Sequence, residues 1–161
     1  MKPDIQIIEK PEWVTWNDIQ DVVHAAHQEN IERGIVMLNA LLPGEKIKEK
    51  VGDGKMFVAL LGNKVVGTAA FKVKESTLWY GCHRYGYRFF EAVHPEYKGQ
   101  GIYGALCKKQ TETAVAKGLD MMMFDTHERN QNVIMMNERK GYYKVGCKVC
   151  RNHNNGGQVM G

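Results

Sequence analysis

The chain has 161 residues, a length that suits one domain with a buried core, so residues 1–161 are predicted to form a single domain. Hydrophobic residues make up 43% of it and charged residues 25%, and the longest clean apolar run, Met56 to Leu61, is far too short to cross a bilayer. No membrane span or membrane partner is therefore expected. The formal net charge of +4 is mild and the basic residues are spread out, which argues against a nucleic-acid partner.

The first third of the chain is predicted to contain a short strand followed by mainly helical residues. The strand is Ile5 to Ile8, and Asn17 is the expected N-cap of the helix that follows it. A second helical region is expected from Ile31 to Leu42, interrupted by Gly34, and a third helix from Glu45 to Val51.

The middle of the chain predicts three strands and a helix. Met56 to Leu61 and Lys64 to Lys74 flank a Gly-Asn dipeptide, which is a two-residue turn signal, so they are expected to pair as a hairpin. The segment Tyr80 to Tyr87 is aromatic and loop-like, whereas Phe89 to Val93 is expected to be a buried strand. A helix from Ile102 to Lys117 follows, and a glycine ends it.

The stretch AVHPEYKGQGIYGAL, from Ala92 to Leu106, joins that strand to that helix through three glycines. Gly99, Gly101 and Gly104 leave the backbone bare where successive N–H groups and the positive helix terminus converge, so an anion such as a pyrophosphate is the expected guest. The stretch lacks the Gly-Lys-Ser/Thr ending of a Walker loop. Its G-x-G-x-x-G spacing lies too late in the chain for a dinucleotide-binding fold, which needs more parallel β/α units after it.

The last third predicts a strand, a helix and a strand. These are Met121 to Asp125, Asn130 to Lys140 and Tyr142 to Val149, with a last short strand at Gly157 to Met160. This alternation of strands and helices along the chain is that of an α/β (α+β) domain.

The glycine turn resembles the signature of the GNAT superfamily of acetyl-CoA-dependent N-acyltransferases, (Gln/Arg)-x-x-Gly-x-(Gly/Ala), over the six positions from Lys98 to Tyr103. Lys98 stands where Gln or Arg is usual, and it keeps the main-chain donor that the family uses for the CoA pyrophosphate. Tyr103 stands where a small residue is usual, so its side chain is expected to point away from the ligand. The resemblance survives both departures.

A second block, from Phe124 to Gly146, resembles the strand, helix and strand that close the cofactor cleft in this superfamily. Gly141 is followed by an aromatic residue, and Asn130 lies eleven residues before it, where the family places an Asn at the start of a helix. The resemblance covers roughly Met56 to Gly146. It leaves the N-terminal segment, the family's variable acceptor side, to be placed by pattern alone.

This resemblance implies a single-domain GNAT fold, with a central mixed, mostly antiparallel sheet of six to seven strands flanked by helices and splayed at the acetyl-CoA cleft. It implies acetyl transfer from acetyl-CoA to a primary amine of a small molecule by direct attack in a ternary complex. The opening of the chain resembles bacterial members found with surface-polysaccharide genes, which favours an amino sugar. The expected acetyl-CoA-binding residues are Val93, Lys98, Gly99, Gln100, Gly101, Tyr103, Gly104 and Asn130.

A base is expected in such a site, because an alkyl amine with a pKa near ~10.4 is mostly protonated at neutral pH. Glu91 is the first candidate, since it lies on the strand that enters the glycine turn. The alternative is a carboxylate paired with Arg88. His27, His83 and His94 are weaker candidates, for which surface or hydrogen-bonded roles are the alternative.

The family's usual acid is missing, because Asn137 stands where a Tyr often lies four residues before the glycine of the second block. Tyr142 is close to the displaced position and is a candidate for protonating the CoA thiolate, with plain packing as the alternative. Asn137 is predicted to bind the cofactor or orient a water, or else to be an ordinary helix-surface residue.

Two other classes of protein are alternatives to an acyltransferase. The absent Tyr suggests a non-catalytic acyl-CoA-binding regulatory domain, and Cys147, Cys150 and His153 suggest a metal or redox module. A structural zinc site needs four ligands, so no metal is expected. The N-terminus lacks the apolar segment of a signal peptide, so we expect a cytoplasmic monomer or homodimer with reduced cysteines.

Overall fold

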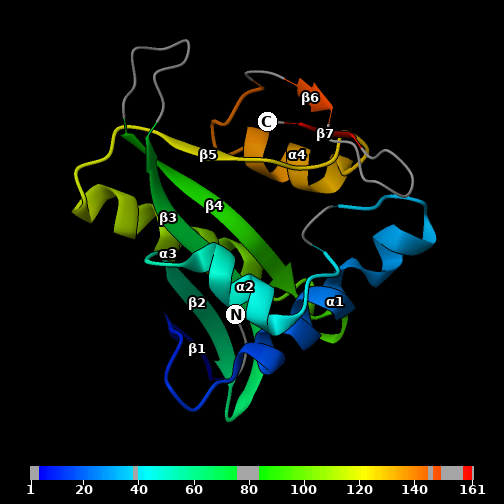
Figure 1. Ribbon diagram of the computed structural model, residues 1–161, viewed down its shortest axis with the longest axis vertical. Coiled ribbons are helices and arrows are strands. Elements are labelled where there is room, and N and C mark those ends of the chain that lie inside the picture. Colours follow the sequence, from blue (N-terminus) through cyan, green and yellow to red (C-terminus); the bar gives the residue numbers. More distant parts are fainter. Residues whose placement is uncertain (1–3, 38–39, 76–83, 145–146, 150–157, 161) are drawn as a thin grey trace.

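Five strands form the central sheet of the computed structural model, which describes residues 4–37, 40–75, 84–144, 147–149 and 158–160 (Figure 1). Their order across the sheet is β1-β2-β3-β4-β5, and only the β4–β5 pair is parallel. The strands are β1 (Ile5–Glu9), β2 (Lys55–Leu61), β3 (Lys64–Glu75), β4 (Arg84–Val93) and β5 (Met122–Phe124). The mixed, mostly antiparallel sheet is therefore as predicted.

The strand count of this sheet differs from the predicted six to seven. The last two strands, β6 (Cys147–Val149) and β7 (Gln158–Met160), pair with each other in a separate two-stranded sheet. The predicted strand from Tyr142 to Val149 is shorter than expected, because residues 142–144 belong to no regular element.

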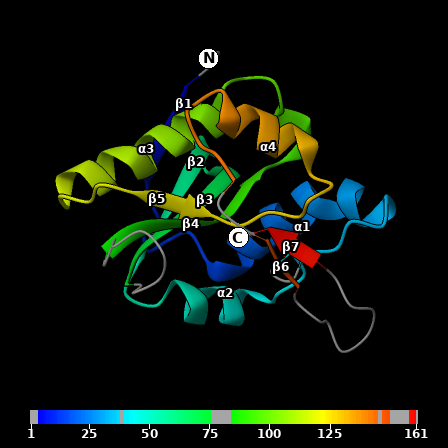
Figure 2. The same ribbon diagram turned by 90° about the horizontal axis from the view of Figure 1, so that it is seen from above.

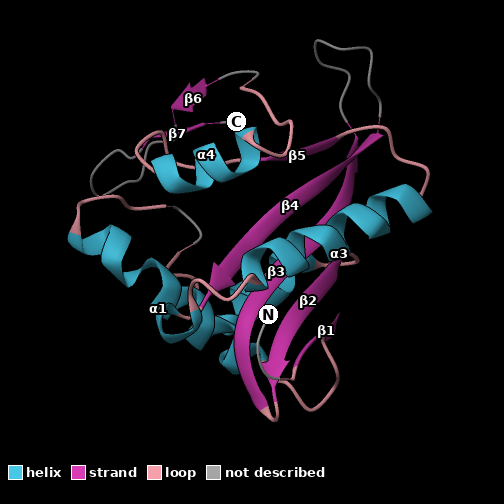
Figure 3. Cartoon of the chain, turned by 180° about the vertical axis from the view of Figure 1, so that it is seen from behind, coloured by secondary structure: helices cyan, strands magenta, loops and turns pink. Residues whose placement is uncertain are grey.

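Helices cover both faces of the central sheet (Figures 2 and 3). Side chains alternate along β2, so Met56 and Val58 pack with α1 (Trp16–Glu32) and α2 (Gly44–Val51) on one face. Phe57 and Ala59 pack with α3 (Ile102–Ala116) on the other face. The fourth helix, α4 (Gln131–Glu138), lies beside β5 (Figure 1). Among the described residues, no helix is long and apolar enough to cross a membrane.

Two expectations about the N-terminal helices are wrong. The N-cap of α1 is Thr15 and not Asn17, because the Thr15 hydroxyl accepts the N–H of Asp18 at 3.0 Å while the Asp18 carboxylate accepts the N–H of Thr15 at 2.9 Å. The second helical region from Ile31 to Leu42 is absent, since 31–32 continue α1 and residues 35–37 and 40–42 are not helical. The left-handed Gly34 follows Arg33, the C-cap of α1.

The β4 strand begins earlier than the sequence predicted. Residues 84–87, expected to be part of an aromatic loop, belong to the strand because they pair with β3, with Tyr87 opposite Lys72. The Tyr87 ring also stacks on Phe89, with 5.2 Å between ring centroids. The hairpin of β2 and β3, the helix α3 and the helix α4 are confirmed within one or two residues at each end.

A bulge interrupts β4 near its carboxyl end. Thr68 lies opposite Ala92 and the second residue after it, Ala70, lies opposite Phe89, so β4 has one more residue than β3 between these pairs. The backbone of Phe90 takes up the extra length with a φ of 49°, in the left-handed region. The buried Thr68 hydroxyl donates a hydrogen bond to the Phe90 carbonyl at 2.8 Å, which holds the bulge from the neighbouring strand.

Replacing Thr68 with Val is expected to lower the free energy of unfolding by about 1–3 kcal/mol, because the buried Phe90 carbonyl loses its donor while the side-chain shape is kept. Urea unfolding measures the change. The control is Thr68→Ser, which keeps the hydroxyl and loses a methyl group, and it should cost about 1 kcal/mol. A Val variant as stable as the wild type would show that the hydroxyl does not hold the bulge.

Candidate active site

The glycine turn lies between β4 and α3, after a short 3₁₀ turn, η1 (Pro95–Tyr97). Gly99 and Gly101 have φ values of 78° and 80°, a conformation that other residues rarely adopt. A Cβ atom placed on Gly99, Gly101 or Gly104 would have nothing within 4 Å. The space in front of the turn is therefore open, and the chain itself does not fill it.

The amides at the start of α3 suit an anion. Gly101 is the N-cap of α3 and gives no side-chain hydrogen bond to it, and the first turn carries no acidic residue. The first helical hydrogen bond runs from the Ala105 N–H to the Gly101 carbonyl at 3.1 Å, so the N–H groups just before Ala105 have no helical partner. This geometry fits a pyrophosphate, and the turn brings together the predicted residues from Lys98 to Gly104.

The β4 and β5 strands separate beside this turn. They pair only where Gly86 to Arg88 meet Met122 to Phe124, although β4 continues to Val93 (Figure 1). Within the described residues, the outer edge of β4 from 89 to 93 therefore has no strand beside it. An extended arm of a ligand has backbone groups to pair with there. The predicted splay of the sheet is confirmed by this geometry.

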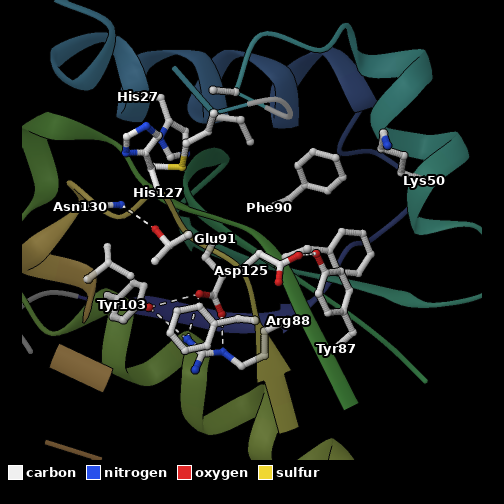
Figure 4. A pocket seen from close by; sticks show the side chains of 17 residues that line it. His27, Lys50, Tyr87, Arg88, Phe90, Glu91, Tyr103, Asp125, His127 and Asn130 are labelled. Atoms are coloured by element: carbon white, nitrogen blue, oxygen red, sulfur yellow. Dashed lines mark hydrogen bonds and ion pairs between the residues drawn. The ribbon is translucent and has the colours of Figure 1, made fainter. Parts of the chain in front are cut away.

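A pocket of about 260 Å³ lies at the separation (Figure 4). Its lining comes from α1 and the residues after it, α2, β4, the start of α3, the end of β5 with the segment after it, and the start of α4. Of the predicted residues, Glu91, Tyr103 and Asn130 line it, whereas Asn137 and Tyr142 do not. Those two residues line a second cavity, on the other side of Phe124 and Thr126, which border both.

Glu91 and Arg88 form a buried ion pair next to the pocket. The Arg88 Nε and Nη2 atoms donate to the two oxygens of the Glu91 carboxylate at 2.6 and 2.8 Å. Arg88 is only 2% exposed. Burial by itself lowers the pKa of Arg88, but the Glu91 carboxylate outweighs burial and holds that pKa above its usual range. The pairing of Glu91 with Arg88, the alternative to a free base, is therefore present.

Tyr103 and Asn137 complete the hydrogen bonds of this pair. The Tyr103 hydroxyl donates to Glu91 Oε1 at 3.1 Å and accepts from Arg88 Nη2 and from Asn137 Nδ2, each at 3.0 Å. Asn137 Oδ1 accepts from Arg88 Nη1 at 2.8 Å. Asn137 is 1% exposed, so it is not a helix-surface residue. Burial, and then the charge of Glu91, raise the pKa of Tyr103, which stays protonated.

The Tyr103 side chain turns toward Glu91 on β4, and the expectation that it points away from the bound cofactor stays a prediction. Its hydroxyl bonds to Glu91, and the residue lines the same pocket, because the first turn of α3 faces β4 at this point. The Tyr103 main chain nevertheless belongs to the glycine turn. One residue thus serves both the turn and the ion pair.

Tyr142 packs on the guanidinium of Arg88. Its ring centroid lies 5.0 Å from Arg88 Cζ, and the ring of Phe124 lies 4.7 Å from the same atom. The Tyr142 hydroxyl points to the Met122 sulfur, at 3.7 Å. Packing, the alternative to an acid role, is what these contacts describe.

Two imidazoles lie on the far side of the pocket from Arg88 (Figure 4). His27 comes from α1, and burial, then the charges of Lys98 and His24, lower its pKa to about 4. His127 comes from the segment after β5 and is 8% exposed. His27 is therefore neutral at physiological pH.

Sequence reasoning missed Asp125, His127 and Tyr87, all of which line the pocket. The Tyr87 hydroxyl donates to Asp125 Oδ2 at 2.9 Å, and burial, then this carboxylate, raise the pKa of Tyr87. The run Asp-Thr-His directly after β5 is a signal that could have found two of them, since ligands of α/β sheets bind outside the carboxyl ends of strands.

The other predicted histidines and cysteines lie elsewhere. His94 Nδ1 accepts the N–H of Glu96 at 3.2 Å, which caps η1, and it does not line the pocket. His83, Cys150 and His153 lie outside the described residues. Among the residues that are described, no group of three or more His, Cys, Asp or Glu is placed to hold a metal ion.

Asn130 is the N-cap of α4 and lines the pocket, at the start of the helix as predicted. Its amide nitrogen donates to Thr126 Oγ1 at 3.1 Å. This bond turns the side chain back toward the segment after β5. Asn130 is thereby held at the edge of the pocket, where its amide oxygen can accept a hydrogen bond.

Comparison with known proteins gives one family and many similar folds. The model of the Acetyltransferase (GNAT) family matches residues 16–142. A protein from Pyrococcus horikoshii OT3 has a TM-score of 0.69 at 21% sequence identity, covering 98% of each chain. A predicted acetyltransferase with acetyl-CoA from Clostridium acetobutylicum has 0.64 at 16%, covering 88% of this chain and 92% of that one. Glucosamine-6-phosphate N-acetyltransferase from Arabidopsis thaliana has 0.66 at 12%, covering 94% and 99%.

Acid is expected to destabilise the protein through His27. The folded-state pKa of about 4 lies below the unfolded value of 6.5, so the unfolded chain binds the proton more readily. The free energy of unfolding should therefore fall as the pH drops from about 6.5 to about 4, and this part of the fall should be missing in His27→Gln. Urea unfolding across this pH range measures it. The prediction would be contradicted if the free energies of unfolding of the wild type and of His27→Gln differed by the same amount at every pH.

Proposed function

Because the chain belongs to the Acetyltransferase (GNAT) family, we propose that it transfers an acetyl group from acetyl-CoA to the primary amine of a small molecule. The observation that carries the proposal is the open, uncapped glycine turn beside the separation of β4 and β5. The amine nitrogen attacks the thioester carbonyl carbon, a C–N bond forms, and the C–S bond breaks as the thiolate leaves. Orientation of the two substrates in one pocket supplies much of the acceleration.

In this proposal, acetyl-CoA binds along one continuous surface, from the glycine turn to the edge of β4. The amides from Gly99 to Gly104 hold the pyrophosphate. The exposed Lys98 lies beside them, where its ammonium group forms an ion pair with Glu29 at 3.8 Å. The pantetheine arm pairs with the free edge of β4 up to Val93. Gln100 belongs to the same turn, and the amide oxygen of Asn130 accepts a hydrogen bond from the arm.

Glu91 accepts the proton of the amine in this proposal. A carboxylate has about four lone-pair sites on its two oxygens. Oε1 accepts from Arg88 and Tyr103, and Oε2 accepts from Arg88, which leaves room for one more hydrogen on Oε2. The ion pair therefore fixes the direction of the carboxylate without occupying all of it.

The departing thiolate needs no dedicated acid, because a thiol has a pKa near ~8.5 and its anion leaves readily. Asn137 supports the transfer by positioning Arg88 and Tyr103. Tyr142 supports it by packing on the Arg88 guanidinium. An enzyme that needs no dedicated acid can be active without the family's usual Tyr. The alternative, a non-catalytic acyl-CoA-binding regulatory domain, predicts binding of acetyl-CoA without turnover of any amine.

An amino sugar is the first acceptor to test. The support is that a protein of the same fold, from Arabidopsis thaliana, is a glucosamine-6-phosphate N-acetyltransferase. The pocket is lined by two carboxylates and by the basic side chains of Arg88 and Lys50, and this mixed charge suits an acceptor with polar groups beside its amine. A free-thiol release assay with acetyl-CoA and a panel of amines tests the acceptor class.

Replacing Gly101 with Asp is expected to weaken acetyl-CoA binding at least ~10-fold, about 1.4 kcal/mol, because it puts a carboxylate where the amides receive the pyrophosphate. Titration calorimetry measures the affinity. The matched control is Gly118→Asp, at the other end of α3, which has a similar φ of 70° and equally open surroundings. Equal affinities in the two variants would show that the turn does not hold acetyl-CoA.

Replacing Glu91 with Gln is expected to lower kcat by about 10²–10⁴ and to remove the acid-side limb of the pH–rate profile, because Gln cannot take up the proton. The control is Glu96→Gln, an exposed carboxylate in η1 that should leave the rate unchanged. A Glu91→Gln enzyme that is slow but has the wild-type pH profile would mean that Glu91 positions other groups and is not the base.

A further inference from the structure

His127 is a buried polar residue to which the proposed reaction gives no role. It is the third residue after β5 and is 8% exposed, and it lines the pocket that also contains Glu91. Buried polar groups in proteins are nearly always paired, so an unpaired one that faces a pocket points to a ligand. The hydrogen bonds that the His127 ring already makes decide whether it presents a donor or an acceptor to a ligand.

One ring nitrogen of His127 is already used. Nδ1 lies 3.1 Å from the N–H of Arg129, two residues further on, and accepts a hydrogen bond from it. Because Nδ1 accepts this hydrogen bond, it carries no hydrogen, and the hydrogen of the His127 ring is therefore on Nε2. The local turn thus fixes the tautomer, and the ring presents a donor at its far end.

Nothing in the described part of the chain accepts this hydrogen. Among those residues, Gln110 Oε1 is the one fully buried side-chain nitrogen or oxygen without a hydrogen-bond partner. Nε2 of His127 has no partner either, so it is not fully buried. Because His127 lines the pocket, Nε2 reaches the open space of that pocket. Figure 4 shows His127 near His27 and α1, whereas Arg88 lies at the opposite side with Glu91 between them. The carboxylates and the imidazole donor therefore occupy different parts of one pocket.

We propose that His127 determines acceptor specificity: its Nε2–H donates a hydrogen bond to an oxygen atom of the acceptor, whose amine lies at Glu91. The inference rests on the proposed acetyl transfer. It names the acceptor as an amine that also carries a hydroxyl or anionic oxygen. Such an acceptor is favoured over a plain alkyl amine, which offers the Nε2–H no oxygen to bond to. Hydroxyl and phosphate oxygens share this chemistry.

Two substitutions by amide side chains test the acceptor at Nδ1 and the donor at Nε2 separately. In His127→Asn the side-chain oxygen takes the place of Nδ1 and still accepts the Arg129 N–H, but the donor at Nε2 is gone. In His127→Gln the longer side chain returns an N–H donor to the position of Nε2. Thermal unfolding of both variants shows whether each is folded.

The acceptors for the test are glucosamine, glucosamine 6-phosphate and cyclohexylamine, which has a six-membered ring and an amine but no oxygen. We expect the wild type to prefer the sugars by kcat/KM. His127→Asn should raise the KM of the sugars about 10-fold, with the KM of acetyl-CoA and the rate with cyclohexylamine unchanged, and His127→Gln should recover part of the loss. A preference for glucosamine would indicate that a hydroxyl oxygen is recognised, and a preference for glucosamine 6-phosphate that a phosphate oxygen is recognised.

Three results would overturn the assignment. They are an equal loss with all three amines, a change confined to the KM of acetyl-CoA, and a wild type that does not prefer the sugars. Binding is followed separately by the ¹⁵N resonance of His127 Nε2 as each sugar is added. A shift without turnover supports His127 and defeats the acetyl transfer, whereas neither shift nor turnover with the sugars overturns the assignment of His127.

Discussion

One extra residue in β4 determines the arrangement of the site. Side chains alternate along a strand, so residues three apart, such as Arg88 and Glu91, would lie on opposite faces of a regular sheet. The bulge at Phe90 shifts the alternation by one position, and the two side chains then meet at 2.6 Å. The ion pair depends on this bulge, and the Thr68 hydroxyl on the neighbouring strand holds it.

The guanidinium of Arg88 in turn connects β4 to three other elements. It bonds to Tyr103 on α3 and to Asn137 on α4, and it lies between two aromatic rings, one of them Phe124 on β5. Removing one partner of a buried ion pair costs about 3–5 kcal/mol because the other charge is left buried, so the loss of either residue would disturb all of these groups. The same contacts fix the Glu91 carboxylate at the pocket, and the rigidity of the site and its chemistry thus have one origin.

The pocket exists because β4 and β5 stop pairing after Arg88. The separation leaves the last part of β4 with an open edge, next to the amides of the glycine turn, and so a long anionic co-substrate and a small amine can approach from two sides. The side near Arg88 offers carboxylates and the side near α1 offers imidazoles, of which His127 has a donor held in one direction by the Arg129 amide. These differences within one pocket are what give an acceptor a preferred orientation.

The sequence by itself determined most of the elements and the glycine turn, because these depend on neighbours in the chain: the apolar pattern of β2, the helix after Gly101, the place of Asn130 before α4. It also pointed to Glu91 and offered Arg88 as its partner. The tertiary structure alone decided that Tyr103 faces into the pocket, that Asn137 is buried and that His127 lies in the same pocket as Glu91. Asn137 and Arg88 are 49 residues apart in the chain, and Asn137 and Tyr103 are 34 apart. Contacts between residues so far apart in the chain follow from how strands and helices pack, and so does the shift of the side-chain alternation at Phe90. No local sequence pattern encodes either of them.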